Sequence, residues 1–319
     1  MQLSDGRIHC VLCPHQCIIP EGKRGRCNVR LNQDGILIAE SYGFITSAGF
    51  DPMEKKPLYH FKPGQHVFSI GSKGCSFKCG FCQNSYIAFG EPNGDLTTID
   101  NILEVMGSRE DNVGIAFTYN EPMVNFEFML EMAKAAKKNG YATVCVTNGY
   151  VMPDALSELV PYMDAFNIDV KAFNDKFYHQ TCRGERAPVM DNIRRIEKHC
   201  HVEVTLLLIQ GENDDPEELE AMFAWLKDIN PEIPLHINRY FPHHEYTKEA
   251  TPISVMLKAE TLAKKYLKYV YLGNVTDVDR NTYCSECGAR VIARDVLHTK
   301  LLIENDTCHA CGAHIPIKL

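Results

Sequence analysis

The stretch "GSKGCSFKCGFCQNS" (residues 71–85) directly follows the apolar run "HVFSI" (66–70) and holds Cys75, Cys79 and Cys82 at C-x3-C-x2-C spacing. Thiols this close in the chain suit metal ligation, because disulfide geometry rarely joins such near neighbours. A tetrahedral ion or a cubane cluster normally takes four protein ligands, so three cysteines leave one place open. Two readings follow: a zinc site that takes a histidine from elsewhere, or a [4Fe–4S] cluster that keeps one iron free.

The apolar run before this stretch begins a repeated pattern of strand, polar turn and helix. Seven short runs are apolar and rich in β-branched residues, as is typical of strands buried on both faces of a parallel sheet. They cover residues 66–70, 113–119, 142–148, 165–171, 202–209, 234–240 and 269–274. Amphipathic stretches between them predict helices over 123–140, with Gly140 as C-terminal cap, and over 214–228, which opens with acidic residues and Pro216. Six or seven such units predict an α/β fold, a partial (β/α)6 TIM-like barrel or a doubly wound sheet.

Polar side chains stand at or near the carboxyl ends of several predicted strands. They are Asn120, Glu121, Asn148, Asp169, Lys171 and Arg239, and His236 stands earlier on the same predicted strand as Arg239. In a barrel these ends meet at one mouth, where the loops form the active site, so the pattern favours an enzyme. For any single residue the alternative is an ordinary polar loop or core position.

The N-terminal residues 1–60 lack the strand–helix pattern and hold four further cysteines in eighteen residues. Cys10, Cys13, Cys17 and Cys27 follow the spacing C-x2-C-x3-C-x9-C. Four thiolates suggest a closed site that holds either structural Zn²⁺ or an auxiliary Fe–S cluster, and the sequence does not separate the two.

The C-terminal residues 276–319 carry two CxxCG turns around a hairpin-like segment. Cys284, Cys287, Cys308 and Cys311 give C-x2-C-x20-C-x2-C, a strong signal for a tetrahedral site. A zinc ribbon is the first interpretation, although a rubredoxin-like iron site uses the same ligands. We therefore predict three units: a four-cysteine metal-binding segment (1–60), a barrel (61–275) and a zinc-ribbon or rubredoxin-like module (276–319).

The composition narrows the function classes. With 319 residues, a formal charge of −8 and 45% hydrophobic residues, the chain does not have the composition of a general nucleic-acid or anionic-membrane binder. The sequence has no apolar run of about 18 residues and no signal-peptide core, so we expect a cytoplasmic protein. Disulfide frameworks belong mostly to short exported chains, so the fourteen cysteines favour metal sites.

The central cysteine motif "CSFKCGFC" resembles the CxxxCxφC signature of the radical S-adenosylmethionine (SAM) superfamily, with Phe81 as the aromatic residue. The resemblance implies that Cys75, Cys79 and Cys82 hold a [4Fe–4S] cluster. It also implies that SAM binds, through its amino and carboxylate groups, the iron that no cysteine ligates.

The same resemblance implies roles for the strand-end residues. "TYNEP" (118–122) stands where the superfamily carries its SAM-amine motif, which implicates Asn120 and has Glu121 accept from the SAM ammonium. "NIDVK" (167–171) is similar to the D-x-K segment of glycyl-radical-enzyme activases. Its Asp169 and Lys171 are thereby expected near SAM. The stretch "VTNGY" (146–150) is similar to the T-N-G strand end of the same activases, which implicates Asn148. His236 and Arg239 of "PLHINRY" (234–240) are further candidates for contact with SAM or substrate.

The chain resembles most closely a narrower, pyruvate formate-lyase-activating-enzyme-like group, the radical SAM member of the AmmeMemoRadiSam system. That likeness runs through nearly the whole chain. It implies reductive cleavage of SAM to a 5′-deoxyadenosyl radical, which abstracts hydrogen from an unidentified substrate. Expected partners are a flavodoxin or ferredoxin as electron donor and Memo-like and AMMECR-type proteins.

Two other functions stay open. A glycyl-radical-enzyme activase is the first, although "TYNEP" departs from the glycine-rich form usual in activases and the cysteine clusters flank the barrel. An Fe–S electron carrier or zinc-built scaffold is the second, and it leaves Glu121, Asp169 and Lys171 without a purpose.

Overall fold

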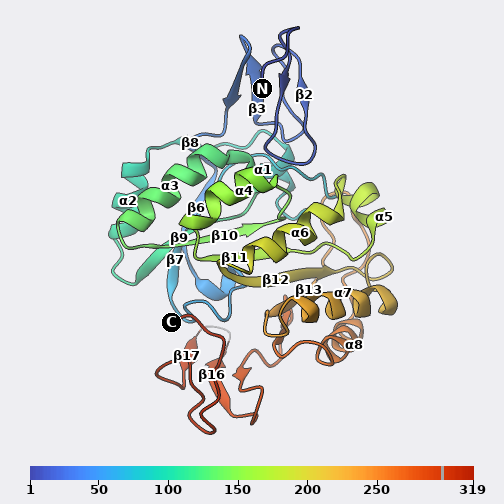
Figure 1. Ribbon diagram of the computed structural model, residues 1–319. Coiled ribbons are helices and arrows are strands. Elements are labelled where there is room, and N and C mark those ends of the chain that lie inside the picture. The colour runs from blue at the N-terminus through green and yellow to red at the C-terminus, as the bar shows by residue number, and fades with distance from the viewer. Residues whose placement is uncertain (296–297) are drawn as a thin grey trace.

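The computed structural model describes residues 1–295 and 298–319. Small N-terminal hairpins and a small C-terminal sheet lie at opposite ends of a central α/β barrel (Figure 1). No helix in the described part of the chain is long and apolar enough to cross a membrane.

The barrel is an open eight-stranded sheet whose order is β14-β13-β12-β11-β10-β9-β7-β6. All neighbours run parallel except β6, which is antiparallel to β7. The strands are β6 (Ser47–Pro52), β7 (His66–Gly71), β9 (Asn112–Phe117), β10 (Ala142–Thr147), β11 (Ala165–Asp169), β12 (His201–Leu208), β13 (Leu235–Arg239) and β14 (Val270–Gly273). The seven parallel strands are the seven predicted ones. Because β14 and β6 stand at the two ends of the order, the barrel is partial, as predicted.

Helices follow six of the parallel strands and cover the outside of the sheet (Figure 1). They are α1 (Ser85–Phe89), α2 (Ile99–Gly107), α3 (Phe126–Lys138), α4 (Pro153–Leu159), α5 (Asp175–Phe177), α6 (Arg186–Ile196), α7 (Pro216–Ile229) and α8 (Ile253–Ala263), with short helices η1 (Met53–Lys55), η2 (Pro122–Asn125), η3 (Val160–Tyr162) and η4 (Tyr178–Cys182). The predicted start of α7 is confirmed: the Asp215 carboxylate accepts from the backbone N–H groups of Glu217 and Glu218.

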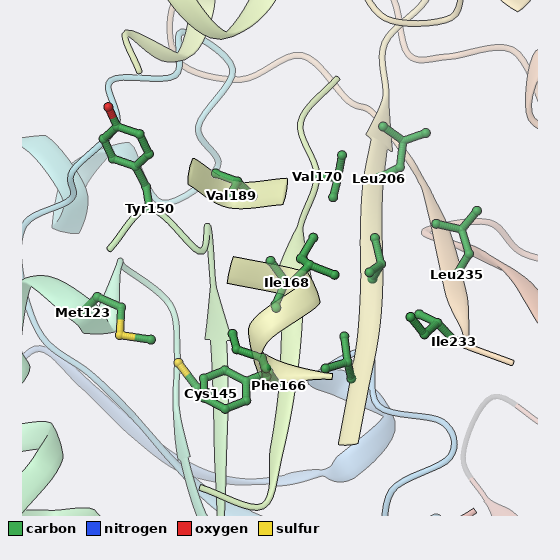
Figure 2. Close-up of a cluster of buried hydrophobic side chains, with 14 of the residues drawn as sticks. Met123, Cys145, Tyr150, Phe166, Ile168, Val170, Val189, Leu206, Ile233 and Leu235 are labelled. Carbon is green, nitrogen blue, oxygen red and sulfur yellow. The ribbon is translucent and has the colours of Figure 1, made fainter. Parts of the chain in front are cut away.

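The main core lies between the sheet and these helices. Figure 2 shows Phe166 and Ile168 of β11, Leu206 of β12 and Val189 of α6 as members of one cluster of buried hydrophobic side chains. Successive residues of a strand face opposite sides, so the other positions of β11 and β12 face the barrel interior. Those interior positions include the buried polar residues Asn167 and Thr205, which places polar groups inside the barrel.

Residues 53–61 close the amino-terminal end of the barrel. Met53, Leu58 and Phe61 pack in a small core with the first residues of the strands. The buried Glu203 carboxylate of β12 accepts from the backbone N–H groups of Tyr59 and His60, at 2.9 and 2.7 Å. The other end of the interior is therefore the open end.

The sheet begins earlier in the chain than the boundary predicted near residue 61. Strand β6 lies within the predicted N-terminal segment and forms the edge of the barrel sheet. Its sequence "SAGFDP" has little apolar character, because an edge strand needs less burial than a central one. The three-part division stays a prediction. Residues 47–61 belong to the barrel, because they form strand β6 and the segment that closes its amino-terminal end.

The terminal parts are built from short strands. The N-terminal hairpins pair β1 (Ile8–His9) with β2 (Ile18–Ile19) and β3 (Arg30–Gln33) with β4 (Ile36–Ala39), and β5 (Phe44–Ile45) pairs with β8 (Asp95–Leu96). The C-terminal sheet has the order β15 (Thr282–Tyr283), β16 (Arg290–Arg294), β17 (Thr299–Leu301). This sheet carries the two CxxCG turns of the predicted ribbon.

Candidate active site

A cavity of about 340 Å³ lies at the carboxyl ends of the strands. Its volume is at the lower end of the range of about 300–1,000 Å³ that is common for small-molecule sites. Nine of the predicted site residues line it: Cys75, Cys79, Phe81, Cys82, Asn120, Glu121, Asn148, Asp169 and Lys171. The fold thus brings together residues that are spread over about a hundred positions of the sequence.

The three cysteines lie on the loop between β7 and α1. Asn120, after β9, holds this loop: its Oδ1 accepts from Ser72 N at 2.9 Å and its Nδ2 donates to Gly74 O at 3.0 Å. Asn148 Nδ2, after β10, lies 3.7 Å from Cys75 Sγ and donates to Ser76 Oγ at 3.1 Å. Burial raises the pKa of the Cys82 thiol to about 11. The neighbouring strand ends therefore hold the first part of the cysteine loop, around Cys75.

Glu121 is almost fully buried, 2% exposed, at the junction between β9 and η2. Its Oε1 accepts from Thr147 Oγ1 at 2.7 Å and from Met123 N at 3.0 Å, and its Oε2 accepts from Asn148 N at 2.8 Å. Burial raises the pKa of this carboxyl group. A carboxylate has about four acceptor positions, so one position, on Oε2, is left for a further donor.

Asp169 and Lys171 form an ion pair beside the cysteines, with 2.7 Å between Nζ and Oδ2. Burial lowers the pKa of Lys171, but the charges of Asp169 and Cys79 outweigh it and raise that pKa overall. The backbone of Lys171 is held as well, since its N–H donates to Tyr178 Oη and its carbonyl accepts from Asn213 Nδ2. The cavity therefore has a charged ammonium group next to the thiols.

The structure also places residues in the cavity that sequence reasoning missed. Tyr119, Lys55 and Lys56 line it, and all three donate to Asp51 of β6, at 2.7 to 2.8 Å. Tyr119 has φ of 72°, a strained backbone for a non-glycine residue that is often found at functional sites. Gly71 leaves the space that Tyr119 occupies, because a Cβ there would lie 2.8 Å from the ring.

His236 and Arg239 are not brought to the cavity. His236 stands at the second position of β13, is buried, and contacts Glu203 with 2.6 Å between Nε2 and Oε2, at the plugged end of the barrel. Arg239 Nε donates to Thr251 O, and its guanidinium lies over Phe241. The pleat puts Asn238 on the same face as His236 but at the open end, so Asn238 lines the cavity instead.

A larger groove of about 810 Å³ lies between α8, β14 and the C-terminal sheet. It is lined by lysines and tyrosines such as Lys264, Lys268 and Tyr283, and none of the eleven clustered cysteines reaches it. The chemistry of the side chains, rather than the volume, therefore assigns the site to the smaller cavity.

The C-terminal cysteines converge on one point. The sulfurs of Cys284 and Cys311, and those of Cys287 and Cys308, lie 3.7 Å apart, and all four lie within 4.8 Å of one another. Four sulfurs around one ion at about 2.3 Å would stand about 3.8 Å apart in a tetrahedron. The arrangement thus fits a tetrahedral metal site and supports the predicted zinc-ribbon-like module.

Residues 69–226, which contain the three cysteines and five of the strands described above, match the Radical SAM superfamily. The chain belongs to the radical SAM superfamily. An uncharacterized protein of Methanocaldococcus jannaschii is 39% identical over 329 residues, which cover 100% of this chain and 98% of that protein. A second protein of that organism, named as a putative glycyl-radical enzyme activating enzyme, is 30% identical over 206 residues, which cover 62% of this chain and 76% of that protein.

The fold of this radical SAM enzyme is also found in solved structures. The crystal structure of Streptococcus suis SuiB bound to S-adenosylmethionine matches with a TM-score of 0.51 and 12% identity, over 65% of this chain and 48% of that chain. At this identity the likeness concerns the fold alone. The predicted superfamily and the likeness to activating enzymes are confirmed, and so is the α/β fold with its central, largely parallel sheet.

Proposed function

We propose that the cavity binds a [4Fe–4S] cluster on Cys75, Cys79 and Cys82, with SAM against the iron that no cysteine ligates. The observation that carries the proposal is that the three thiols, the Glu121 carboxylate and the Asp169–Lys171 pair all line this one cavity. When both are bound, cluster and SAM supply one-electron cleavage of a C–S bond to give methionine and a 5′-deoxyadenosyl radical, which abstracts hydrogen from the substrate.

The residues of the chain have separate tasks in this proposal. Glu121 offers its remaining acceptor position to the SAM ammonium, in a dry setting where a charge-assisted bond is strong. Lys171 faces the SAM carboxylate or ribose, and Asp169 keeps its ammonium in place. Asn120, Asn148 and Phe81 act as positioning residues: the amides brace the cysteine loop, and Phe81 packs 5.9 Å from the Phe177 ring.

The substrate and system are finer proposals. We place the enzyme in the AmmeMemoRadiSam system, with Memo-like and AMMECR-type proteins as partners and a flavodoxin or ferredoxin as electron donor. The motif resemblance over nearly the whole chain supports this assignment. A cytoplasmic location fits the fourteen cysteines, all of which are free thiols in the structure, since a reducing compartment keeps them so. The two flanking four-cysteine sites are proposed as metal sites, with Zn²⁺ at the C-terminal one.

A glycyl-radical-enzyme activase is the second candidate. It is favoured by one observation, the 30% identity with a relative named as such an activating enzyme. Its substrate would be the backbone of a glycine on a partner protein. The electron-carrier alternative is not favoured by any feature of the site, because it needs neither Glu121 nor the Asp169–Lys171 pair.

The test is anaerobic SAM cleavage. Protein reconstituted with iron and sulfide and reduced with dithionite should form 5′-deoxyadenosine, measured by liquid chromatography with mass spectrometry. The variant in which Cys75, Cys79 and Cys82 are changed to Ala should form none. Cys200→Ala, which removes a thiol that does not line the cavity and contacts Met163 O instead, is the control and should keep the wild-type rate. Cleavage by the triple variant would refute the proposal.

The same reaction distinguishes the two substrate classes. Addition of candidate Memo-like and AMMECR-type proteins should give a mass change in a protein or small molecule. A glycyl radical signal in the EPR spectrum of a partner protein would instead identify an activase.

A further inference from the structure

A second set of cysteines surrounds a cavity outside the active site. Cys10, Cys13, Cys17 and Cys27 all line this cavity, which lies between the N-terminal hairpins and the barrel. The rest of its wall is largely apolar and includes Leu12, Ile19, Val124 and Tyr150. Four thiols that face one enclosed apolar space are a ligand set for a metal centre.

The distances between the cysteine sulfurs help to distinguish a site for a single metal ion from a site for an iron–sulfur cluster. Throughout residues 1–295 and 298–319, the C-terminal cysteines alone form a group of three or more candidate ligands whose atoms all lie within 4.8 Å. The N-terminal set and the set of Cys75, Cys79 and Cys82 both stand wider. Four thiolates on a single ion must come close together, whereas thiolates on separate irons of a cubane stand further apart. The N-terminal set thus resembles the active-site set and differs from the ribbon.

A buried cation without a full set of partners points to an anion in the same cavity. Arg30 lines the cavity and is 3% exposed. Its Nε donates to Val124 O at 3.1 Å and its Nη1 to Glu127 Oε1 at 2.6 Å, but its Nη2 has no hydrogen-bond partner in the described structure. Leaving a buried charged donor without an acceptor is unfavourable, so an acceptor is expected there. Sulfur atoms of an anionic cluster would be that acceptor.

The cavity also adjoins the active-site loop directly. His15, two residues after Cys13, donates from Nε2 to the carbonyl of Ser76 at 2.8 Å, and Ser76 is the neighbour of Cys75. Gly74 has φ of 89°, and a Cβ at this position would lie 2.7 Å from the carbonyl oxygen of Cys27. The backbones of the two cysteine segments therefore touch, which gives a short path between the two sets of thiols.

We propose that Cys10, Cys13, Cys17 and Cys27 hold a second [4Fe–4S] cluster that relays electrons to the active-site cluster. It takes one electron from a protein donor of the flavodoxin or ferredoxin class and passes that electron on through the His15–Ser76 contact. The donor is oxidised by one electron, and the active-site cluster is reduced by one. The relay role rests on the proposed function, whereas the presence of the second cluster does not.

Metal analysis of the full chain tests the site. The variant with Cys75, Cys79 and Cys82 changed to Ala, reconstituted anaerobically with iron, sulfide and zinc, should keep about four irons per chain and one zinc. A further change of Cys10 and Cys13 to Ala should remove this iron. A triple variant with two zinc ions and no iron would overturn the proposal. A triple variant with as much iron as the wild type would instead overturn the proposed function.

Arg30 gives a second, spectroscopic test that does not depend on activity. In the triple variant, Arg30→Met should move the midpoint potential of the remaining cluster to a more negative value, because a nearby cation favours the reduced, more anionic state. Arg24→Met is the matched control, since Arg24 pairs with Glu40 at the exposed surface and does not line the cavity. EPR-monitored redox titration measures both. An unchanged potential in Arg30→Met would contradict the placement of the cluster beside Arg30.

The choice of reductant tests the relay. Cys10→Ala/Cys13→Ala should lose at least about tenfold in SAM cleavage driven by reduced flavodoxin but keep cleavage driven by dithionite, which is small enough to reach the active site directly. Retained dithionite-driven activity also shows that the barrel has folded. Equal losses with both reductants, or no loss with either, would refute the relay. A wild-type protein that cleaves SAM with neither reductant would refute the proposed function.

Discussion

Replacement of Glu121 by Gln is the sharpest test of how the cavity binds SAM. The carboxylate already accepts three hydrogen bonds and has one acceptor position left. If that position takes the SAM ammonium, Glu121→Gln removes a charge-assisted bond worth about 1.5–3 kcal/mol. The dissociation constant for SAM should therefore rise about ten- to a hundredfold. Calorimetric titration of SAM into anaerobic, cluster-loaded protein measures this.

The same change also affects folding, for a reason visible in the structure. An amide has one oxygen and one NH₂ group, so the NH₂ must face a donor: either Asn148 N–H or the pair of Thr147 and Met123. One buried hydrogen bond is lost, and we expect the free energy of unfolding to fall by about 1–3 kcal/mol. A stability loss alone would therefore not show that Glu121 binds SAM.

Thr147→Val separates the two effects. It keeps the shape of the Thr147 side chain and removes one donor to Glu121, but leaves the carboxylate charge. We expect a stability loss similar to that of Glu121→Gln and nearly unchanged SAM affinity. If Glu121→Gln bound SAM as tightly as Thr147→Val and the wild type, Glu121 would only cap η2, and the proposed contact with the ammonium would be wrong.

Three further predictions follow from other parts of the molecule. Cys308→Ala should remove the C-terminal zinc and lower the melting temperature, while SAM cleavage per folded, cluster-loaded molecule stays near wild type; iron at this site in the wild type would contradict the zinc assignment. Burial lowers the pKa of His60 from 6.5 to about 3, so between these values the unfolded chain binds more protons than the folded one. The free energy of unfolding should thus fall by up to about 1.4 kcal/mol per unit as pH drops below 6.5, and His60→Gln, compared by thermal melts at pH 7 and 5.5, should flatten this dependence. Asp51→Asn should loosen Lys56 and Tyr119 and weaken SAM binding without loss of iron, and unchanged affinity would exclude these residues from the binding site.

The sequence predicted the barrel well because its central strands are covered on both faces. Such strands read as continuous apolar runs, and each of the seven runs is a parallel strand of the sheet. The edge strand β6 gave no such signal, because its sequence "SAGFDP" buries only Asp51 fully, whereas β14 at the other edge is apolar and largely buried. With β6 missed, Asp51, Lys55 and Lys56 were missed as well, because only the antiparallel pairing with β7 brings them to the cavity.

Site residues could be predicted where a sequence motif fixes their positions. They could not be predicted where their place in the cavity depends on how far along a strand they stand. The cysteine loop and the residues that follow strands β9, β10 and β11 were found, since each stands just past a carboxyl end. On β13 the apolar run does not show where the cavity begins along the strand. His236 and Asn238 share a face, but only Asn238 reaches the open end. The left-handed backbone of Tyr119 and the unpaired Nη2 of Arg30 depend on tertiary packing, so no sequence pattern shows them.

EPR spectroscopy of the reduced protein before and after addition of SAM shows whether SAM binds the cluster. We expect part of the reduced-cluster signal to change when SAM is added, because SAM binds the iron that Cys75, Cys79 and Cys82 leave open. In the variant with these three cysteines changed to Ala, that SAM-sensitive part should be absent. A spectrum that SAM does not alter, or a SAM-sensitive signal that persists in the triple variant, would contradict SAM binding at a cluster held by these three cysteines.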